Sequence, residues 1–175
     1  MKHEIINETR MREMERNLGC VFCKDGECAE MSLDVGGYTE KTAPIPGITF
    51  GRFDGDVETI RAIVRQVEPD WAKYFSEDSF IFCAYANGEP ISFCLVDELA
   101  DGCMLARPGI KVGSIGCVGT LPAHRGHGIG LRMVDLATLL LRDAACDKIY
   151  ISYTHIDHWY AKLGYEVFAR FSFQK

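Results

Sequence analysis

Length, composition and charge limit what this chain can be. Its 175 residues are 47% hydrophobic and 25% charged, which suits one well-buried domain and is short for two. The formal net charge of -6 argues against a nucleic-acid-binding protein and mildly favours cationic substrates such as amines. The sequence contains no apolar run long enough to span a membrane, and its first residues lack the apolar centre of a signal peptide. We therefore expect a cytoplasmic protein with no membrane partner.

The first 47 residues are predicted to form a helix followed by an arm. Residues 8–18 are charged, carry two methionines and a leucine at helical spacing, and end at Gly19. Residues 20–46 give mixed signals and read as a loop or short arm. We accordingly divide the chain into an N-terminal helix and cysteine-bearing arm at 1–47 and a globular domain at 48–175.

Three of the eight cysteines lie close together in this arm, at Cys20, Cys23 and Cys28. His3 is a conceivable fourth zinc ligand, but the sequence has no second pair of cysteines at this spacing. We therefore expect free thiols on a hairpin and no metal site. Cysteines within apolar strand patterns are expected to be buried thiols: Cys83, Cys94 and Cys117.

The residue pattern of the first part of the domain predicts a strand, two helices and a hairpin. Ile48–Phe53 is a short strand, and apolar residues at helical spacing from Val57 onward predict a helix that Pro69 ends. A second helix restarts near Trp71. Two apolar runs, at 80–86 and 91–97, are then joined through Asn87-Gly88, the dipeptide that fits a tight hairpin turn.

A strand, a glycine-rich turn and a long helix follow between Val112 and Ala144. The strand covers 112–120, and the turn, Pro122–Gly130, places glycine at 126, 128 and 130 where the helix begins. Backbone N–H groups can therefore converge there on a phosphate, with Arg125 as a neighbouring cation. The alternative is an ordinary strand-loop-helix joint with capping glycines.

The helix after this turn carries its apolar residues on one stripe and its polar residues largely on the other side. The stripe is Ile129, Met133, Leu136, Ala137, Leu140 and Ala144, and the polar side is Arg132, Asp135, Thr138, Arg142 and Asp143. The helix crosses to a strand at 148–154, most simply parallel to the strand at 112–120. A capping box at 154–157 then opens a short helix that ends at Gly164, and a last strand begins at Tyr165.

These elements predict an α/β (α+β) fold with a mixed, mostly antiparallel sheet of six to seven strands flanked by helices. Two motifs make the chain resemble the GNAT superfamily of N-acetyltransferases. Arg125, Gly128 and Gly130 match the family's Arg/Gln-x-x-Gly-x-Gly/Ala signature, and Tyr160–Tyr165 is similar to its Tyr-x-x-x-Gly-Phe/Tyr ending. The order of elements from Ile48 to Phe173 also fits the acetyltransferase fold.

The resemblance implies that acetyl-CoA binds as co-substrate. Backbone amides from Gly126 to Leu131 would hold its pyrophosphate, and Val118 to Thr120 would flank the pantetheine and thioester. A backbone donor aimed at the thioester oxygen would lower the barrier by about 3 kcal/mol. The implied cofactor-binding residues are Val118, Gly119, Thr120, Arg125, Gly126, His127, Gly128, Ile129, Gly130 and Leu131.

Tyr160 matches the family's position for the residue that protonates the leaving coenzyme A thiolate. A core aromatic beside Trp159 is the alternative role. The base is open between Asp97, Glu98 and His155, because the strand before the signature has no glutamate. Many members carry an asparagine after the fifth strand where this chain has Tyr153-Thr154.

The activity that the resemblance implies is acetyl transfer to a primary amine of a small molecule or peptide by direct attack on the thioester. The alternative is a non-catalytic acyl-CoA-binding module whose N-terminal arm engages a partner. The glycine spacing is not that of a dinucleotide-binding fold, since it is not GxGxxG. The acceptor and the oligomeric state, including a homodimer, remain open.

Overall fold

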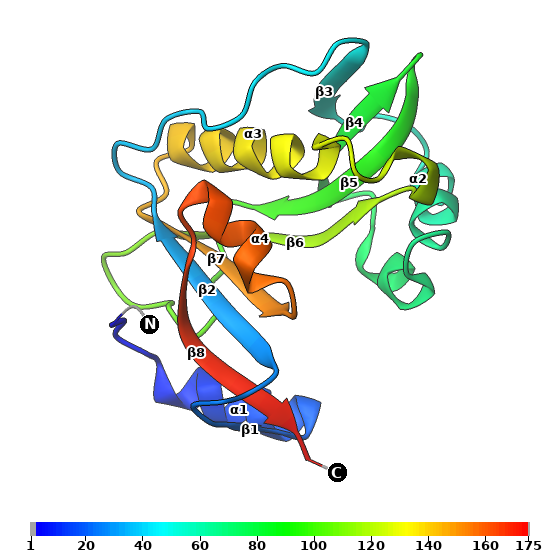
Figure 1. Cartoon of the computed structure of the whole chain (residues 1–175). Helices are drawn as coiled ribbons and strands as arrows, with labels where there is room; N and C mark the ends of the chain where they lie inside the picture. The colour runs from blue at the N-terminus through cyan, green and yellow to red at the C-terminus, as the bar shows by residue number, and fades with distance from the viewer. Residues whose placement is uncertain (1–2, 175) are drawn as a thin grey trace. The chain divides into compact units, whose positions relative to one another are not determined.

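The computed structural model describes residues 3–174, in which eight strands are hydrogen-bonded in the order β1-β8-β2-β7-β6-β5-β4-β3 (Figure 1). The described residues form two compact units. The first contains the chain up to Tyr38, Glu98–Ser114 and the chain from Arg142, and the second contains Thr39–Asp97 and Ile115–Leu141. Strand β6 (Val112–Thr120) belongs to both. The predicted mixed α/β fold is confirmed, with eight strands rather than six to seven.

In the first unit, β8 (Glu166–Phe173) lies between β1 (Cys20–Phe22) and β2 (Cys28–Asp34) and is antiparallel to both. β2 is also antiparallel to β7 (Lys148–Thr154). β7 runs parallel to β6, as predicted, through three residue pairs from Val112↔Lys148 to Ser114↔Tyr150.

The prediction of a loop or hairpin at residues 20–46 was wrong, because β1 and β2 each pair with β8 and not with each other. The connection between them crosses β8 closely: a methyl group at Gly26 would lie 2.5 Å from the backbone oxygen of Phe171. β1 and β2 pair with β8, which lies more than a hundred residues later in the sequence. The residues around β1 and β2 therefore contain no hairpin pattern, and this is why these strands were not predicted. The boundary at residue 47, as the limit of the acetyltransferase domain, stays a prediction.

The helices of the first unit agree with the predicted bounds. Helix α1 (Glu8–Leu18) begins at Asn7, whose side chain accepts from the Arg10 N–H, and ends at Gly19 with φ 63°. Figure 1 shows α1 beside β1 at the N-terminal end of the chain. Helices α4 (Asp157–Tyr160) and η3 (Ala161–Leu163) end at Gly164 with φ 94°.

The predicted capping box at 154–157 is absent from the described structure. α4 begins after Ile156, with no side-chain cap, and the Thr154 hydroxyl accepts from the Ile156 N–H at 3.2 Å. Asp157, the expected reciprocal partner, instead forms an ion pair with Arg170 on β8. Long-range charge pairing has replaced the local cap.

The second unit contains β3 (Ile48–Arg52), β4 (Phe80–Ala86) and β5 (Glu89–Asp97), with β4 antiparallel to both others. The predicted hairpin is confirmed, and its turn residues Asn87 and Gly88 have φ values of 52° and 83°. Positive φ at both positions is the requirement that selects Asn-Gly. Helices α2 (Val57–Val64) and η1 (Pro69–Tyr74) pack their apolar residues against Phe93 of β5 and Cys83 of β4.

The remaining helices of the second unit are η2 (Pro122–His124) and α3 (Ile129–Asp143), which follow β6. The predicted division of α3 into apolar and polar sides was wrong in part: Ile129, Met133 and Ala137 of the apolar stripe are buried and Asp143 is exposed, as expected. Arg132, Asp135 and Thr138 are buried, whereas Leu140 is 38% exposed. Asp135 and Arg132 are buried because the backbone around Thr42 bonds to them, and the Thr138 hydroxyl donates to the Val134 carbonyl of the same helix. The helical periodicity of a single segment cannot indicate such contacts.

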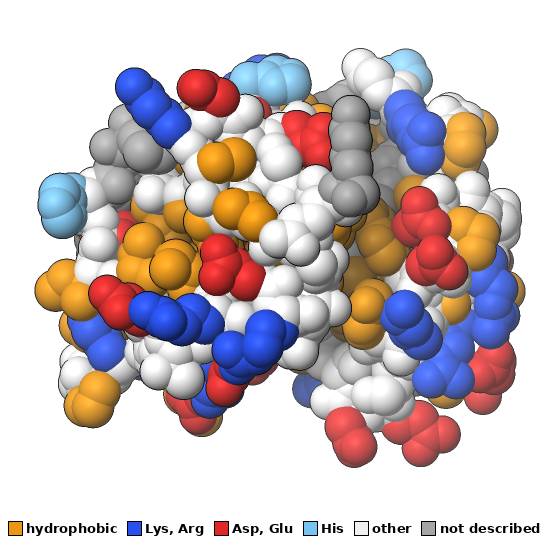
Figure 2. Space-filling view, turned by 90° about the horizontal axis from the view of Figure 1, so that it is seen from below, with side chains coloured by type: hydrophobic (Ala, Val, Ile, Leu, Met, Phe, Trp, Pro, Cys, Tyr) orange, Lys and Arg blue, Asp and Glu red, His pale blue; other side chains and the backbone are white. Residues whose placement is uncertain are grey.

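The outer surface carries charges of both signs. On the face that Figure 2 draws, basic and acidic side chains are interspersed. Ion pairs among the described residues include Arg61–Glu58 and Arg10–Glu13. Among the helices of the described residues, none is both long and apolar enough to cross a membrane.

Candidate functional site

The end of β6 is closely packed in the second unit. A methyl group at Gly119 would lie 2.7 Å from Cε2 of Phe93, so no larger residue fits there without displacing that ring. The Ser92 hydroxyl donates to the Gly119 carbonyl at 2.7 Å and lies 2.8 Å from the Thr120 hydroxyl. These contacts hold the last residues of β6 in place. Val118 and Thr120 remain half-buried.

The glycine-rich turn after β6 is exposed and takes a conformation that glycine permits. Gly126 and Gly128 have φ values of 82° and 77°, and a methyl group on either would meet no atom within 4 Å. Arg125 is exposed, and its Nε donates to the Thr120 carbonyl at 2.9 Å. The turn therefore leaves its backbone open to a ligand, with a guanidinium held beside it.

Helix α3 begins directly after this turn. The Arg132 N–H donates to the Gly128 carbonyl at 2.9 Å, so the helical hydrogen bonds start there. The N–H groups of Ile129, Gly130 and Leu131 precede the first such bond and have no acceptor within the helix. Together with the positive end of the helix dipole, these donors suit a diphosphate. Residues 118–131, which sequence reasoning assigned to acetyl-CoA, lie within one compact unit.

A buried polar network anchors α3, and sequence reasoning missed it. Oδ2 of Asp135, whose residue has no exposed surface, accepts from the Lys41 N–H at 2.9 Å, the Thr42 N–H at 2.7 Å and the Thr42 hydroxyl at 2.6 Å. Arg132 forms an ion pair with Glu40 and lies 3.9 Å from Asp135. The sequence did contain one signal of this network, because Arg132 and Asp135 are oppositely charged and three positions apart on the helix.

Tyr160, the predicted general acid, lies in α4 of the first unit. It is only 5% exposed, and its ring packs edge-on against Trp159 and Tyr165, with centroids 4.8 and 6.1 Å away. Gly164 ends the following turn with φ 94°. This left-handed conformation favours glycine, which explains the glycine in the Tyr160–Tyr165 motif. Tyr160 and the loop at 125–131 belong to different units, and its catalytic role stays a prediction.

The three candidate bases have different surroundings. Asp97 ends β5, and Glu98 lies 3.7 Å from the Lys111 ammonium. His155 follows β7, is exposed, and has its Nδ1 3.7 Å from the Cys28 sulfur. Burial raises the pKa of the Cys28 thiol to about 11, so at neutral pH this sulfur is a thiol and not a thiolate.

The cysteines of the N-terminal segment have different surroundings from one another. Cys20 and Cys28 are buried around Phe171, whereas Cys23 is exposed. Among the described residues, no group of three metal-ligating side chains lies close enough to hold an ion. Of the thiols predicted to be buried, Cys83 and Cys94 have no exposed surface and Cys117 is half-buried.

A second feature that sequence reasoning missed is a buried carboxyl, Glu30 on β2. It accepts from the Tyr150 hydroxyl, from the Tyr153 N–H at 2.9 Å and from the Ser152 hydroxyl at 3.3 Å. Burial raises the pKa of Glu30 to about 7, against the opposing effect of these hydrogen bonds. A lone glutamate in a segment predicted to be an arm gave no signal of burial.

Comparison with known proteins identifies the family. The model of the acetyltransferase (GNAT) family matches residues 54–165, a span that includes β6, the glycine turn, α3 and the tyrosine motif. The chain belongs to this family. GNAT members transfer acyl groups from acetyl-CoA, and the resemblance inferred from the two motifs is confirmed. A search of curated proteins finds no match.

Solved GNAT structures share the fold at low sequence identity. A GCN5-related glucosamine N-acetyltransferase region of a fungal multi-domain β-N-acetylglucosaminidase has a TM-score of 0.67 at 17% identity, covering 96% of this chain and 23% of the other. GCN5-related N-acetyltransferases from Sphaerobacter thermophilus and Kribbella flavida have TM-scores of 0.62 and 0.61, at 21% and 19% identity. These cover 94% and 95% of this chain. The chain spans 55% and 64% of their respective lengths.

Proposed function

We propose that this protein is an acetyl-CoA-dependent N-acetyltransferase that moves an acetyl group to a primary amine. The observation that carries the proposal is the glycine turn before α3, in which Gly126 and Gly128 take left-handed conformations and leave their amides exposed. This geometry fits a diphosphate, and it occurs inside the span that matches the acetyltransferase family.

In the proposed reaction, the amides of residues 126–131 and the Arg125 guanidinium bind the pyrophosphate of acetyl-CoA. The backbone of Val118–Thr120 lies along the pantetheine. The rigid packing of Gly119 against Phe93 supports this role, because a fixed backbone can orient the thioester without losing further conformational entropy. Nothing in the step requires a metal.

The chemistry is a direct transfer. The unprotonated amine attacks the thioester carbon, the carbon–nitrogen bond forms, and the carbon–sulfur bond breaks. The departing thiolate takes a proton from the Tyr160 hydroxyl, and a base removes the proton that the amine nitrogen carries. Of the three candidate bases, we favour His155, because it is exposed and carries no ion pair among those described, whereas Glu98 lies beside Lys111.

Binding is tested by isothermal titration with acetyl-CoA and with coenzyme A. Gly126→Asp places a negative charge in the turn at a φ that aspartate tolerates, and we expect it to weaken binding about tenfold or more by like-charge repulsion. Gly109→Asp is the matched control, because Gly109 is also exposed, has φ 79°, and has no atom within 4 Å of an added methyl group. Equal affinity in both variants would contradict the proposed site.

Turnover is tested separately, by measuring coenzyme A release over a panel of primary amines at saturating acetyl-CoA. Release that depends on the amine supports the transferase. Binding of acetyl-CoA without release for any amine or peptide would instead favour the non-catalytic acyl-CoA-binding module.

A further inference from the structure

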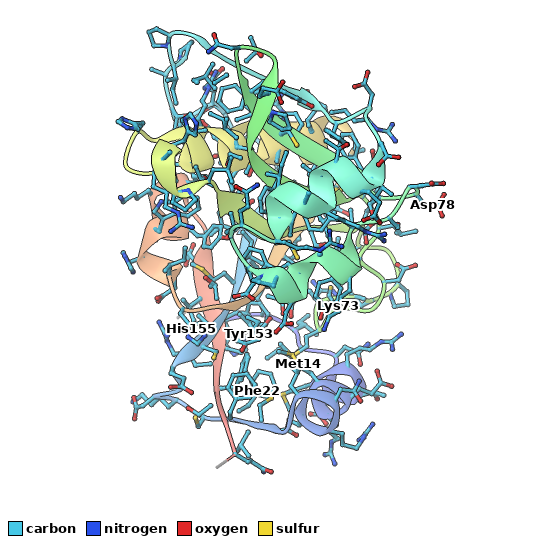
Figure 3. The ribbon with its side chains drawn as sticks, turned by 90° about the vertical axis from the view of Figure 1, so that its right-hand side faces the viewer. Met14, Phe22, Lys73, Asp78, Tyr153 and His155 are labelled. Atoms are coloured by element: carbon cyan, nitrogen blue, oxygen red, sulfur yellow. The ribbon has the colours of Figure 1, made fainter. Side chains whose placement is uncertain are left out.

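Five aromatic rings, four from strands β1, β7 and β8 and one from the residue that follows β7, form one cluster in the first unit. Tyr153 lies at its centre, with ring centroids 5.6 Å from His155, 5.7 Å from Phe171 and 5.3 Å from Phe173. Phe22 of β1 completes the cluster, 5.5 Å from Phe171. Figure 3 shows Tyr153 and His155 next to each other, with Met14 and Phe22 below them in that view. Tyr153 meets His155 and Phe173 edge-to-face and Phe171 at a tilt, and such contacts hold its ring in one orientation.

The cluster has a buried side and an exposed side. Phe171 has no exposed surface, whereas Tyr153 is 45% exposed and His155 is also exposed. A large aromatic ring that is packed on one side and exposed on the other offers a flat surface to a ligand. Its side chain has already lost its conformational entropy on folding. A ligand that stacks on it therefore binds without ordering the ring.

The backbone at Tyr153 is held in an unusual conformation. Its φ of 52° is left-handed, which for a non-glycine residue costs about 1 kcal/mol or more. The buried Glu30 carboxyl accepts the Tyr153 N–H at 2.9 Å and so stabilises this conformation. Strain of this kind, maintained by surrounding structure, is concentrated at ligand-binding positions.

The cluster also occupies a position where α/β proteins bind ligands. Tyr153 and His155 lie at the carboxyl end of β7, the strand that pairs in parallel with β6. Ligands of open sheets bind outside the carboxyl ends of parallel strands.

We propose that Tyr153 and His155 form the acceptor subsite and select a primary amine attached to a flat aromatic group, an arylalkylamine. This inference rests on the proposed function. The phenol ring of Tyr153 stacks on the aromatic body of the acceptor, and the His155 imidazole beside it faces the amine as the proposed base. Tyr153 is a specificity-determining residue, and Glu30 is a positioning residue that acts through the Tyr153 backbone.

The test compares 2-phenylethylamine with ethanolamine, a primary amine that lacks the ring, at saturating acetyl-CoA. Tyr153→Asn removes the ring and keeps a residue that tolerates left-handed φ, so the backbone is preserved. We expect kcat/KM for 2-phenylethylamine to exceed that for ethanolamine about tenfold in the native protein, and Tyr153→Asn to remove this preference mainly through a higher KM. Tyr153→Phe should retain it.

Val21→Ala is the control, because Val21 is 43% exposed in the same unit and makes none of the ring contacts described above. Circular dichroism verifies that each variant is folded. Titration of 2-phenylethylamine into the coenzyme A complex gives a second measurement that needs no turnover, and binding that Tyr153→Asn weakens and Tyr153→Phe preserves would support the subsite.

The outcomes separate the subsite from the proposed activity. If ethanolamine and 2-phenylethylamine are acetylated equally well and Tyr153→Asn slows both alike, the subsite is wrong and the transferase stands. If the protein neither binds acetyl-CoA nor acetylates any amine, the proposed function fails, and the subsite that rests on it fails as well.

Discussion

The Glu30 carboxyl, buried on β2, accepts the backbone N–H of Tyr153 on β7 at 2.9 Å. Through this contact, a side chain from the N-terminal segment fixes a strained residue at the end of a strand more than a hundred positions away. The same carboxyl accepts from the Tyr150 and Ser152 hydroxyls, so one buried acidic group on β2 bonds to three residues of the neighbouring strand β7.

Stability is expected to fall with rising pH because of Glu30. Its pKa is raised from 4.5 in the unfolded chain to about 7 in the folded protein, so the folded state binds more protons between these values. The contribution of Glu30 protonation to the free energy of unfolding is therefore fully present below about pH 4.5 and is lost as the pH rises through about 7. The loss is at most about 3 kcal/mol.

Urea unfolding at several pH values between these limits measures this effect. Glu30→Gln should flatten the decline, and Glu89→Gln, which changes an exposed glutamate, should leave it as in the native protein. An unchanged pH dependence in Glu30→Gln would show that another group is responsible.

Gly119→Ala should destabilise the protein by about 1–3 kcal/mol, because the added methyl group would lie 2.7 Å from Cε2 of Phe93 and overpack the core of the second unit. Gly116→Ala on the same strand is the control, since a methyl group there meets no atom within 4 Å. Urea midpoints measure the difference. Similar midpoints for the two variants would contradict the packing described for β6.

Asp135→Ala should lower the free energy of unfolding by about 3–5 kcal/mol, since it removes the acceptor of three hydrogen bonds and leaves the Arg132 guanidinium buried beside an empty position. Asp143→Ala changes an exposed residue of the same helix and should shift stability by less than about 1 kcal/mol. Thermal unfolding of both variants measures the contrast, and a mild effect of Asp135→Ala would mean that the loop around Thr42 contributes little.

Tyr160→Phe should lower kcat about 100-fold while the dissociation constant of acetyl-CoA stays the same, because the variant loses a proton donor and keeps the ring. Tyr38→Phe is the control, as Tyr38 is 6% exposed and lies in the same unit. Coenzyme A release and calorimetric titration provide the two measurements. Equal rates for native protein and Tyr160→Phe would assign the tyrosine to the core, beside Trp159.

Much of the fold could be predicted because its signals are local. The Asn87-Gly88 turn requires two positive φ values, which this dipeptide readily adopts. The glycines at 126 and 128 also have positive φ, and they stand directly before an amphipathic helical pattern, so the turn can be recognised from neighbouring residues alone. The parallel pairing of β6 and β7 follows from the length of the helix that joins them. The mistakes occurred where partners are distant, as for β1 and β2 on either side of β8.

The amino-acid sequence by itself determined the family, the glycine turn before α3 and the tyrosine motif, because each depends on residue types within a few positions of one another. Only the tertiary structure decided that Glu30 is buried and accepts the Tyr153 N–H, that Asp135 anchors the backbone at Thr42, and that five rings gather around the end of β7. Burial and desolvation depend on which strands and loops meet, and no local pattern contains that information.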